Sequence, residues 1–234
     1  MNETPTLFLL PGLLCDGTVW RHQMEHLSDV VEIRVPDYRD CDSLTAMADL
    51  VLEDAPERFA VAGHSMGGRV ALEIMRKAGG RVSHLALIDT ATGPTRDSEY
   101  PKRLGWVDLA RTRGMAALTD VWLPPMVHPE RIGDAALMQP LRAMVERYTP
   151  DQFAGEIRAL LERPDATPVL ASVTCPTLVL CGRQDAWSTL EIHEKILAGL
   201  VNAEVRLEVI EDCGHFAPIE RPQAVTAALR RWLT

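Results

Sequence analysis

Short apolar runs alternate with longer amphipathic stretches along most of the chain, and this alternation is what most restricts its fold. The apolar runs show little polar alternation, which is typical of strands covered on both faces, as in a parallel sheet. They lie at 6–10, 30–35, 59–62, 84–88, 177–181 and 205–210. Apolar spacings of three and four predict helices between and after them, at 18–27, 44–53, 66–78, 189–200 and 223–233.

Alternation of strand and helix predicts an α/β protein with a doubly wound, mainly parallel six-stranded sheet and right-handed crossovers. The length of 234 residues and the apolar content of 47% suit one such body. The alternation stops between Pro94 and Pro168, where helical patterns occur at 104–113, 115–123, 135–148 and 152–162. We therefore expect a core of 1–93 and 169–234 with a helical cap, 94–168, inserted between the fourth and fifth strands. The alternative is that these helices are further crossovers of the sheet.

Charge and cysteine content exclude several classes of partner and site. The net charge of −9 would repel a phosphate backbone, so no nucleic acid is expected. No apolar stretch approaches the ~20 residues that span a bilayer. The first ten residues have no basic side chain, and the apolar run 7–10 is too short for a signal peptide. Five cysteines without a CxxC pair predict neither a metal site nor a disulfide framework, so we expect a cytoplasmic protein.

The strongest local motif is Gly63-His64-Ser65-Met66-Gly67, between a predicted strand and a predicted helix. A GxSxG sequence in this context is typical of a sharp turn that exposes a nucleophilic serine. The glycines give the turn the room it needs, and the start of the helix favours developing negative charge. We expect Ser65 to be the nucleophile; without that context, the motif would be an ordinary glycine-rich turn.

A serine nucleophile needs a base, and His215 is the best placed of the seven histidines because it follows the last predicted strand. His64 adjoins Ser65 on a sharp turn and points elsewhere, while His193 is expected to be a surface or partly buried helix residue. The carboxylate that orients the base is expected to be Asp185, after the fifth predicted strand, which gives the chain order Ser, Asp, His. Asp89, after the fourth strand, is the competitor.

Acyl transfer also needs N–H donors for the developing oxyanion. The Met66 N–H directly follows the nucleophile, and Leu13, in the loop after the first predicted strand, is expected to supply the second donor. Apolar side chains of this loop, of the cap and of the segment after His215 are expected to line the substrate pocket, unless they only pack helices together. We predict Leu14, Trp106, Trp122, Met126 and Phe216 for this role.

The cap also carries several arginines that could meet an anionic group of the substrate. We single out Arg111, Arg113, Arg142 and Arg147. A solvated helical face explains them more simply.

Together these segments resemble the α/β-hydrolase superfamily, and within it small carboxylesterases of the pimeloyl-ester type. The resemblance is carried by Leu-Leu-Pro-Gly at 9–12 with Trp20, Gly-His-Ser-Met-Gly-Gly at 63–68, and the segments 176–185 and 214–222. It covers nearly the whole chain outside the cap. Many relatives have His-Gly where this chain has Pro11-Gly12, and the two leading strands of the family are missing, so that strand 6–10 corresponds to the third.

The residues and the resemblance together predict a serine hydrolase that cleaves small-molecule carboxylic esters or thioesters, with no metal or other cofactor. No oligomeric state is predicted. One alternative keeps the triad and hydrolyses a carbon–carbon bond, as ring-fission hydrolases do. Another is a non-catalytic ligand-binding protein of the same fold, which the complete set of Ser65, Asp185 and His215 argues against. Dehalogenases and epoxide hydrolases would need a carboxylate at position 65.

Overall fold

Six parallel strands form one sheet, in the order β2-β1-β3-β4-β5-β6, in the computed structural model, which describes residues 4–234. The strands are β1 (Thr6–Leu10), β2 (Glu32–Arg34), β3 (Phe59–His64), β4 (Val82–Ile88), β5 (Thr177–Gly182) and β6 (Val205–Ile210). The doubly wound parallel sheet predicted from the sequence is confirmed. Residues 1–3, part of the stretch in which no signal peptide is predicted, lie outside the described residues.

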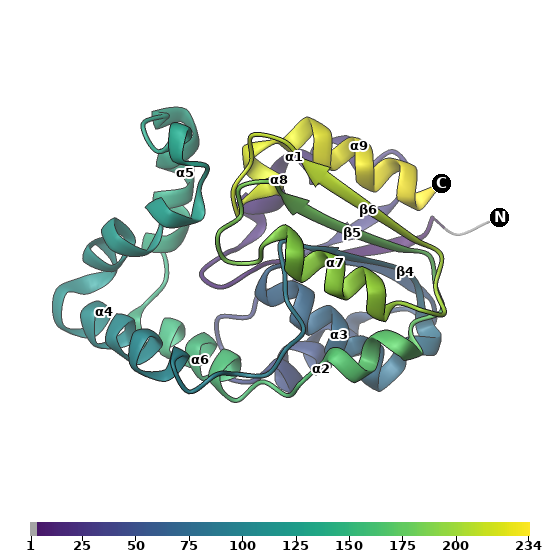
Figure 1. Ribbon diagram of the computed structural model, residues 1–234, viewed down its shortest axis with the longest axis horizontal. Coiled ribbons are helices and arrows are strands. Elements are labelled where there is room, and N and C mark those ends of the chain that lie inside the picture. Colours follow the sequence, from purple (N-terminus) through teal and green to yellow (C-terminus); the bar gives the residue numbers. More distant parts are fainter. Residues whose placement is uncertain (1–3) are drawn as a thin grey trace.

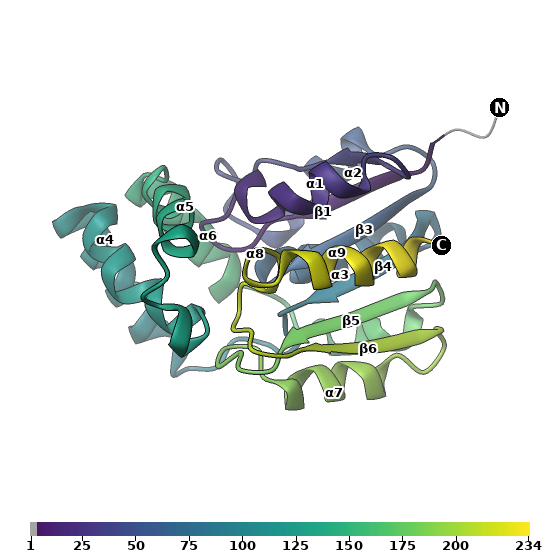
Figure 2. The same ribbon diagram turned by 90° about the horizontal axis from the view of Figure 1, so that it is seen from above.

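Helices cover both faces of this sheet (Figures 1 and 2). One face carries α1 (Arg21–Leu27) and α9 (Pro222–Leu233), and the other carries α2 (Leu44–Asp54), α3 (Met66–Ala78) and α7 (Leu190–Gly199). The predicted helix 18–27 is divided into a 3₁₀ turn, Gly17–Trp20, and α1. A short helix, α8 (Ala217–Glu220), follows the loop after β6.

Burial follows the position of each strand in the sheet. Every residue of β1, β3 and β5 is buried, as their apolar sequences predict. The edge strands β2 and β6 are only partly covered, because an edge strand has a neighbour on one side only. β2 is shorter than the predicted run 30–35. The central strands therefore provide the rigid frame whose carboxyl ends position the loops described below.

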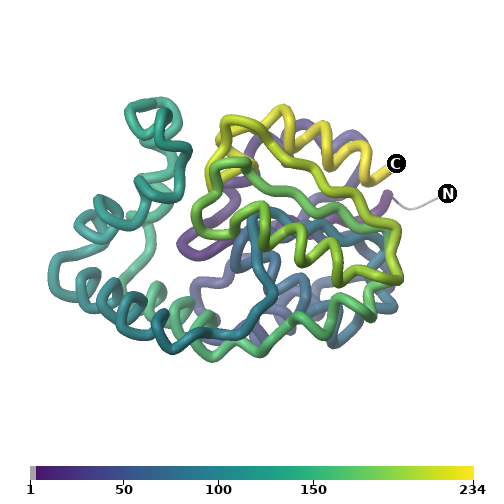
Figure 3. Tube along the Cα trace, viewed as in Figure 1, coloured from purple at the N-terminus to yellow at the C-terminus, as the bar shows by residue number. Residues whose placement is uncertain are grey.

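Three helices stand beyond the carboxyl ends of the strands, apart from the layers that cover the sheet (Figures 1 and 2). They are α4 (Glu99–Trp122), α5 (Ala135–Glu146) and α6 (Pro150–Leu161), and they lie between β4 and β5 in sequence. Gly114 in α4 has a φ of 83° and divides this helix where the sequence predicts two. The C-terminus lies at the opposite end of the molecule (Figure 3). Within residues 4–234, no helix is both long and apolar enough to span a bilayer.

Candidate active site

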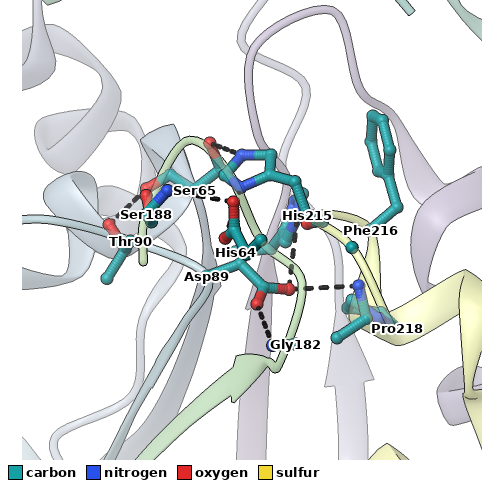
Figure 4. Close-up of polar contacts among 12 residues, drawn as sticks. His64, Ser65, Asp89, Thr90, Gly182, Ser188, His215, Phe216 and Pro218 are labelled. Atoms are coloured by element: carbon teal, nitrogen blue, oxygen red, sulfur yellow. Dashed lines mark hydrogen bonds and ion pairs between the residues drawn. The ribbon is translucent and has the colours of Figure 1, made fainter. Parts of the chain in front are cut away.

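Ser65 occupies the tight turn between β3 and α3, with a φ of 54°. A non-glycine residue with positive φ is strained, and such strain collects at functional sites. The end of β4 and the loop after it hold the turn. The Ser65 N–H donates to the Ile88 carbonyl at 2.9 Å, and the Thr90 hydroxyl donates to the Ser65 carbonyl at 2.6 Å (Figure 4). The side chain is thereby presented at the carboxyl edge of the sheet.

Two glycines make the turn sterically possible. A Cβ on Gly63 would lie 2.3 Å from the Gly67 carbonyl oxygen, and a Cβ on Gly67 would lie 2.2 Å from the Leu10 carbonyl oxygen. Both contacts are with backbone atoms, which cannot move aside as a flexible side chain can. The glycines of the GxSxG motif are therefore required for the close passage of α3 over β1.

His215 lies within hydrogen-bond distance of both Ser65 and Asp185. Its Nε2 is 2.8 Å from Ser65 Oγ, and its Nδ1 is 2.8 Å from Asp185 Oδ2. The Nδ1–H donates to the carboxylate, which leaves Nε2 free to accept the Ser65 proton. The backbone N–H of His215 donates to the Met126 carbonyl at 2.7 Å, so the segment after α4 helps to hold the histidine loop. These three side chains come from the three strand ends that the sequence predicts.

Asp185 is itself held in one orientation. Its Oδ1 accepts the N–H groups of Trp187 at 2.7 Å and Ser188 at 2.9 Å, while Oδ2 faces His215. Burial alone would raise the pKa of this carboxyl, but His215 and the two N–H donors outweigh it and lower the pKa below its ordinary value. Asp185 is therefore ionised at neutral pH and able to stabilise a protonated His215.

Asp89, the competing carboxylate, makes different contacts. Its side chain is fully buried, and its two oxygens accept the N–H of Gly182 at 2.9 Å and the N–H of Ala217 at 3.1 Å (Figure 4). Burial and the nearby Asp185 charge raise the pKa of Asp89 well above its ordinary value. Asp89 thus links the end of β5 to the start of α8, whereas His215 bonds to Asp185.

Two further histidines support the site without contacting the Ser65 hydroxyl. The His64 Nε2–H donates to the His215 carbonyl at 2.7 Å, and burial together with the neighbouring His215 lowers the His64 pKa to about 3, so it is neutral. His193 is fully buried, whereas the helical pattern predicted a surface or partly buried residue. Its Nε2 accepts the Thr90 N–H at 3.1 Å and thereby fixes the residue that bonds to the Ser65 carbonyl.

Leu13 and Met66, the predicted oxyanion donors, both line the cavity that contains Ser65. Met66 is the first residue of α3, so its N–H has no partner within the helix. The Leu13 N–H has no acceptor within residues 4–234. Both donors are therefore available beside the nucleophile.

The cap fastens the loop that carries Leu13. Glu156 of α6 accepts the Leu14 N–H at 2.8 Å, and the Tyr148 hydroxyl donates to the Cys15 carbonyl at 2.6 Å. Leu14 has a φ of 57° and its side chain is fully buried in the core. The predicted placement of Leu14 in the pocket is therefore wrong, because this backbone conformation turns its side chain away from the cavity, whose lining includes Leu13 and Cys15 instead.

The cavity beside Ser65 has a volume of about 250 Å³, and residues of the sheet-end loops and of helices α4 and α6 line it. Trp106, Trp122, Met126 and Phe216 line it, as the sequence predicts. The four cap arginines singled out from the sequence do not line it; Arg111, Arg142 and Arg147 pair at the surface with Asp151, Asp120 and Asp16. The lining instead includes other cations that the sequence did not identify, namely Arg69, Arg96, Lys102, Arg103 and Arg163. Within residues 4–234, no group of three or more His, Cys, Asp or Glu side chains is arranged so that it could hold a metal ion.

Known proteins of this architecture include esterases and other hydrolases. A pimeloyl-[acyl-carrier protein] methyl ester esterase of Vibrio campbellii is 28% identical, over 93% of this chain and 84% of that protein. A 2-hydroxy-6-oxononadienedioate/2-hydroxy-6-oxononatrienedioate hydrolase of Escherichia coli is 24% identical, over 97% of this chain and 86% of that protein. A solved thermophilic esterase from Thermogutta terrifontis superposes with a TM-score of 0.88 at 29% identity, covering 98% of this chain and 89% of that one. The model of the alpha/beta hydrolase family matches residues 7–229, so the chain belongs to that family.

Proposed function

We propose that this protein is a serine hydrolase that cleaves carboxylic esters, and thioesters, through an acyl-enzyme on Ser65. The observation that carries the proposal is the hydrogen-bonded series from Ser65 Oγ through His215 to Asp185, with both steps at 2.8 Å. A nucleophile within reach of a base that a third group orients is the arrangement on which covalent acyl transfer depends.

Each step of the reaction has a group in the site. His215 Nε2 takes the Ser65 proton as Oγ attacks the carbonyl carbon, and the N–H groups of Leu13 and Met66 stabilise the resulting oxyanion. The bond to the leaving group then breaks, and His215 returns the proton to the departing alkoxide or thiolate. A water molecule, deprotonated by His215, then attacks the carbonyl carbon of the acyl-enzyme. The bond to Ser65 Oγ breaks, His215 returns the proton to Oγ, and the carboxylic acid is released.

Carbon–carbon bond hydrolysis is the second candidate, because relatives of similar identity are named as hydrolases of 2-hydroxy-6-oxo-dienedioates, which are substrates of the dienoate type. An ester leaving group needs only the proton that His215 supplies, whereas a carbon leaving group also needs an electron sink in the substrate and a group that protonates carbon. The site geometry already accounts for the ester reaction, which we therefore favour.

The cap acts in this proposal as a lid domain, 94–168, over a core of 1–93 and 169–234. Because the cavity is small, at about 250 Å³, we expect short to medium acyl chains and small-molecule esters as substrates. A reducing cytoplasm fits the five cysteines, all of which are free thiols. No metal or cofactor takes part in the steps above.

The test is a panel of substrates with one purified enzyme. We expect kcat/KM for short aryl esters and for an acyl thioester to exceed that for a ring-fission dienoate by a factor of at least about 100. The activity is expected to survive treatment with a chelator. A clear preference for the dienoate would replace ester hydrolysis by carbon–carbon cleavage and leave the assignment of the nucleophile standing.

A further inference from the structure

The cavity beside Ser65 is strongly cationic on one wall, although the whole chain carries a net charge of −9. Five basic side chains line it, against Glu99 as its one carboxylate among residues 4–234. Four of the five and this carboxylate form what we call the cationic wall: Arg69, Lys102, Arg103 and Arg163 with Glu99. Neither the family match nor the reaction steps proposed above require these charges.

Arg69 is the guanidinium of this wall that has no carboxylate partner among residues 4–234. It follows Ser65 by four residues, near the start of α3, and both side chains line the cavity. Within residues 4–234 its guanidinium makes one hydrogen bond, from Nη1 to the Gly93 carbonyl at 3.0 Å, and no ion pair. Burial and the nearby Arg163 and Arg103 lower its pKa to about 9, so it is still charged at neutral pH.

The other two arginines share a single carboxylate. Arg163 Nη2 lies 2.6 Å from Glu99 Oε1, and Arg103 Nη2 lies 3.0 Å from Glu99 Oε2. Burial opposes the ionisation of Glu99, but these arginines outweigh it and lower its pKa to about 2. One negative charge therefore faces three guanidinium groups, and the wall keeps an excess of positive charge.

Lys102 extends the wall toward solvent. Its ammonium lies 4.4 Å from the centre of the Trp187 ring and 5.0 Å from that of Trp106, and no carboxylate among residues 4–234 pairs with it. The two rings fix the position of the charge while leaving its N–H donors free.

Charges held away from water are costly unless an opposite charge accompanies them, and a guanidinium matches a carboxylate with two parallel hydrogen bonds. We propose that the cationic wall binds a carboxylate on the substrate, so that this enzyme hydrolyses esters that carry a second, anionic group a few carbon atoms from the scissile bond. This inference rests on the proposed ester hydrolysis and adds its specificity. The carboxylate can belong to the acyl chain or to the alcohol, and the test has one arm for each.

The first measurement compares kcat/KM for charged and neutral esters of equal length. The acyl arm uses monomethyl esters of the C4 to C7 dicarboxylic acids against methyl esters of the corresponding monocarboxylic acids. The alcohol arm uses O-acetyl hydroxy acids against alkyl acetates. In at least one arm we expect the charged ester to be preferred by about 10- to 100-fold, which is the contribution of a hydrogen-bonded charge pair.

Substitutions then assign the preference to Arg69. Because the preference is a ratio of two rate constants, a general loss of activity cancels. Arg69→Met is expected to reduce the ratio at least tenfold. Arg69→Lys keeps the charge but cannot make two parallel hydrogen bonds as a guanidinium does, so it is expected to retain part of the preference. Arg111→Met is the matched control: it removes a cap arginine that is 56% exposed, paired with Asp151 and outside the cavity, and the ratio should not change.

Failure of this inference can be told apart from failure of the proposed function. Equal kcat/KM for charged and neutral esters in both arms, with neutral esters still hydrolysed, would overturn the inference alone. If no ester is hydrolysed, calorimetric titration of the Ser65→Ala protein with glutarate and adipate decides. Binding that weakens at least tenfold on adding Arg69→Met supports the cationic wall, and absence of binding overturns it.

Discussion

Exchanging either of two buried aspartates for asparagine should separate catalysis from stability. In Asp185→Asn, the retained Oδ1 still accepts the N–H groups of Trp187 and Ser188, so the loop after β5 keeps its structure. The new amide replaces Oδ2, which lies 2.8 Å from His215 Nδ1. An amide N–H2 can only donate there, so Nδ1 must accept and the ring proton moves to Nε2, which then cannot take the Ser65 proton.

Asp89→Asn should destabilise the fold and leave the catalytic hydrogen bonds of His215 in place. Both Asp89 oxygens accept backbone N–H groups, from Gly182 and Ala217, and an oxygen can do so whether the carboxyl is ionised or protonated. An asparagine side chain has one acceptor oxygen, so its NH2 group would face one of these two backbone N–H groups and leave it without an acceptor. Leaving a buried donor unsatisfied costs roughly 1–3 kcal/mol, or a fall in Tm of about 2–12 °C for a domain of this size.

The assay pairs steady-state kinetics with thermal unfolding of the same samples. We expect Asp185→Asn to lower kcat by about 10²–10⁴-fold with nearly unchanged Tm. Asp89→Asn should lower Tm by the amount above and reduce kcat by no more than about tenfold. If instead Asp89→Asn abolishes turnover and Asp185→Asn leaves it intact, the carboxylate that orients His215 has been assigned to the wrong strand end.

Three further substitutions test how the site is held. Burial raises the pKa of Glu156 to about 8, against an ordinary value of 4.5. Between these two pH values the folded protein keeps a proton that the unfolded chain releases, so the free energy of unfolding should fall as pH rises from 4.5 to 8. Glu156→Gln removes this titration, so the Tm of the variant relative to that of the wild type should rise over that interval. Parallel curves of Tm against pH for the two proteins would contradict the raised pKa of Glu156. Gly67→Ala should fail to fold or lose at least about 1–3 kcal/mol, because its Cβ meets the Leu10 carbonyl oxygen, and an unchanged chemical unfolding midpoint would refute the steric explanation. Tyr148→Phe removes the hydroxyl that donates to Cys15 and should cost about 1 kcal/mol in the same assay, whereas a stabilised variant would mean that this contact does not fasten the cap.

The parts of the site that depend on local sequence could be predicted. The turn at Ser65 follows from glycines flanking a serine between a buried strand and an amphipathic helix, and all of this lies within a few residues. The placement of His215 and Asp185 followed from one further rule, that the carboxyl ends of parallel strands meet at one edge of the sheet. That rule cannot distinguish Asp185 from Asp89, since both follow strands; the distinction requires the hydrogen bonds themselves.

Features that depend on how distant segments pack could not be predicted. Leu14 looked like a pocket residue, but its positive φ and its bond to Glu156, 142 residues away, direct its side chain into the core. His193 lies in a helical pattern, and only the approach of Thr90 makes it a buried hydrogen-bond partner. The cationic wall combines Arg69 of the core with residues of the cap, so no single stretch of sequence displays it.

Labelling by a fluorophosphonate probe tests most directly whether Ser65 is the nucleophile. Intact-mass measurement followed by peptide mapping should show one adduct per chain, on the peptide that contains Ser65. Ser65→Ala should take up no label, and it should lose ester hydrolysis together with His215→Ala, by about 10³-fold or more, because the triad acts as a unit. Labelling that persists undiminished in Ser65→Ala, or that maps to another residue, would contradict the proposal that catalysis proceeds through an acyl-enzyme at this turn.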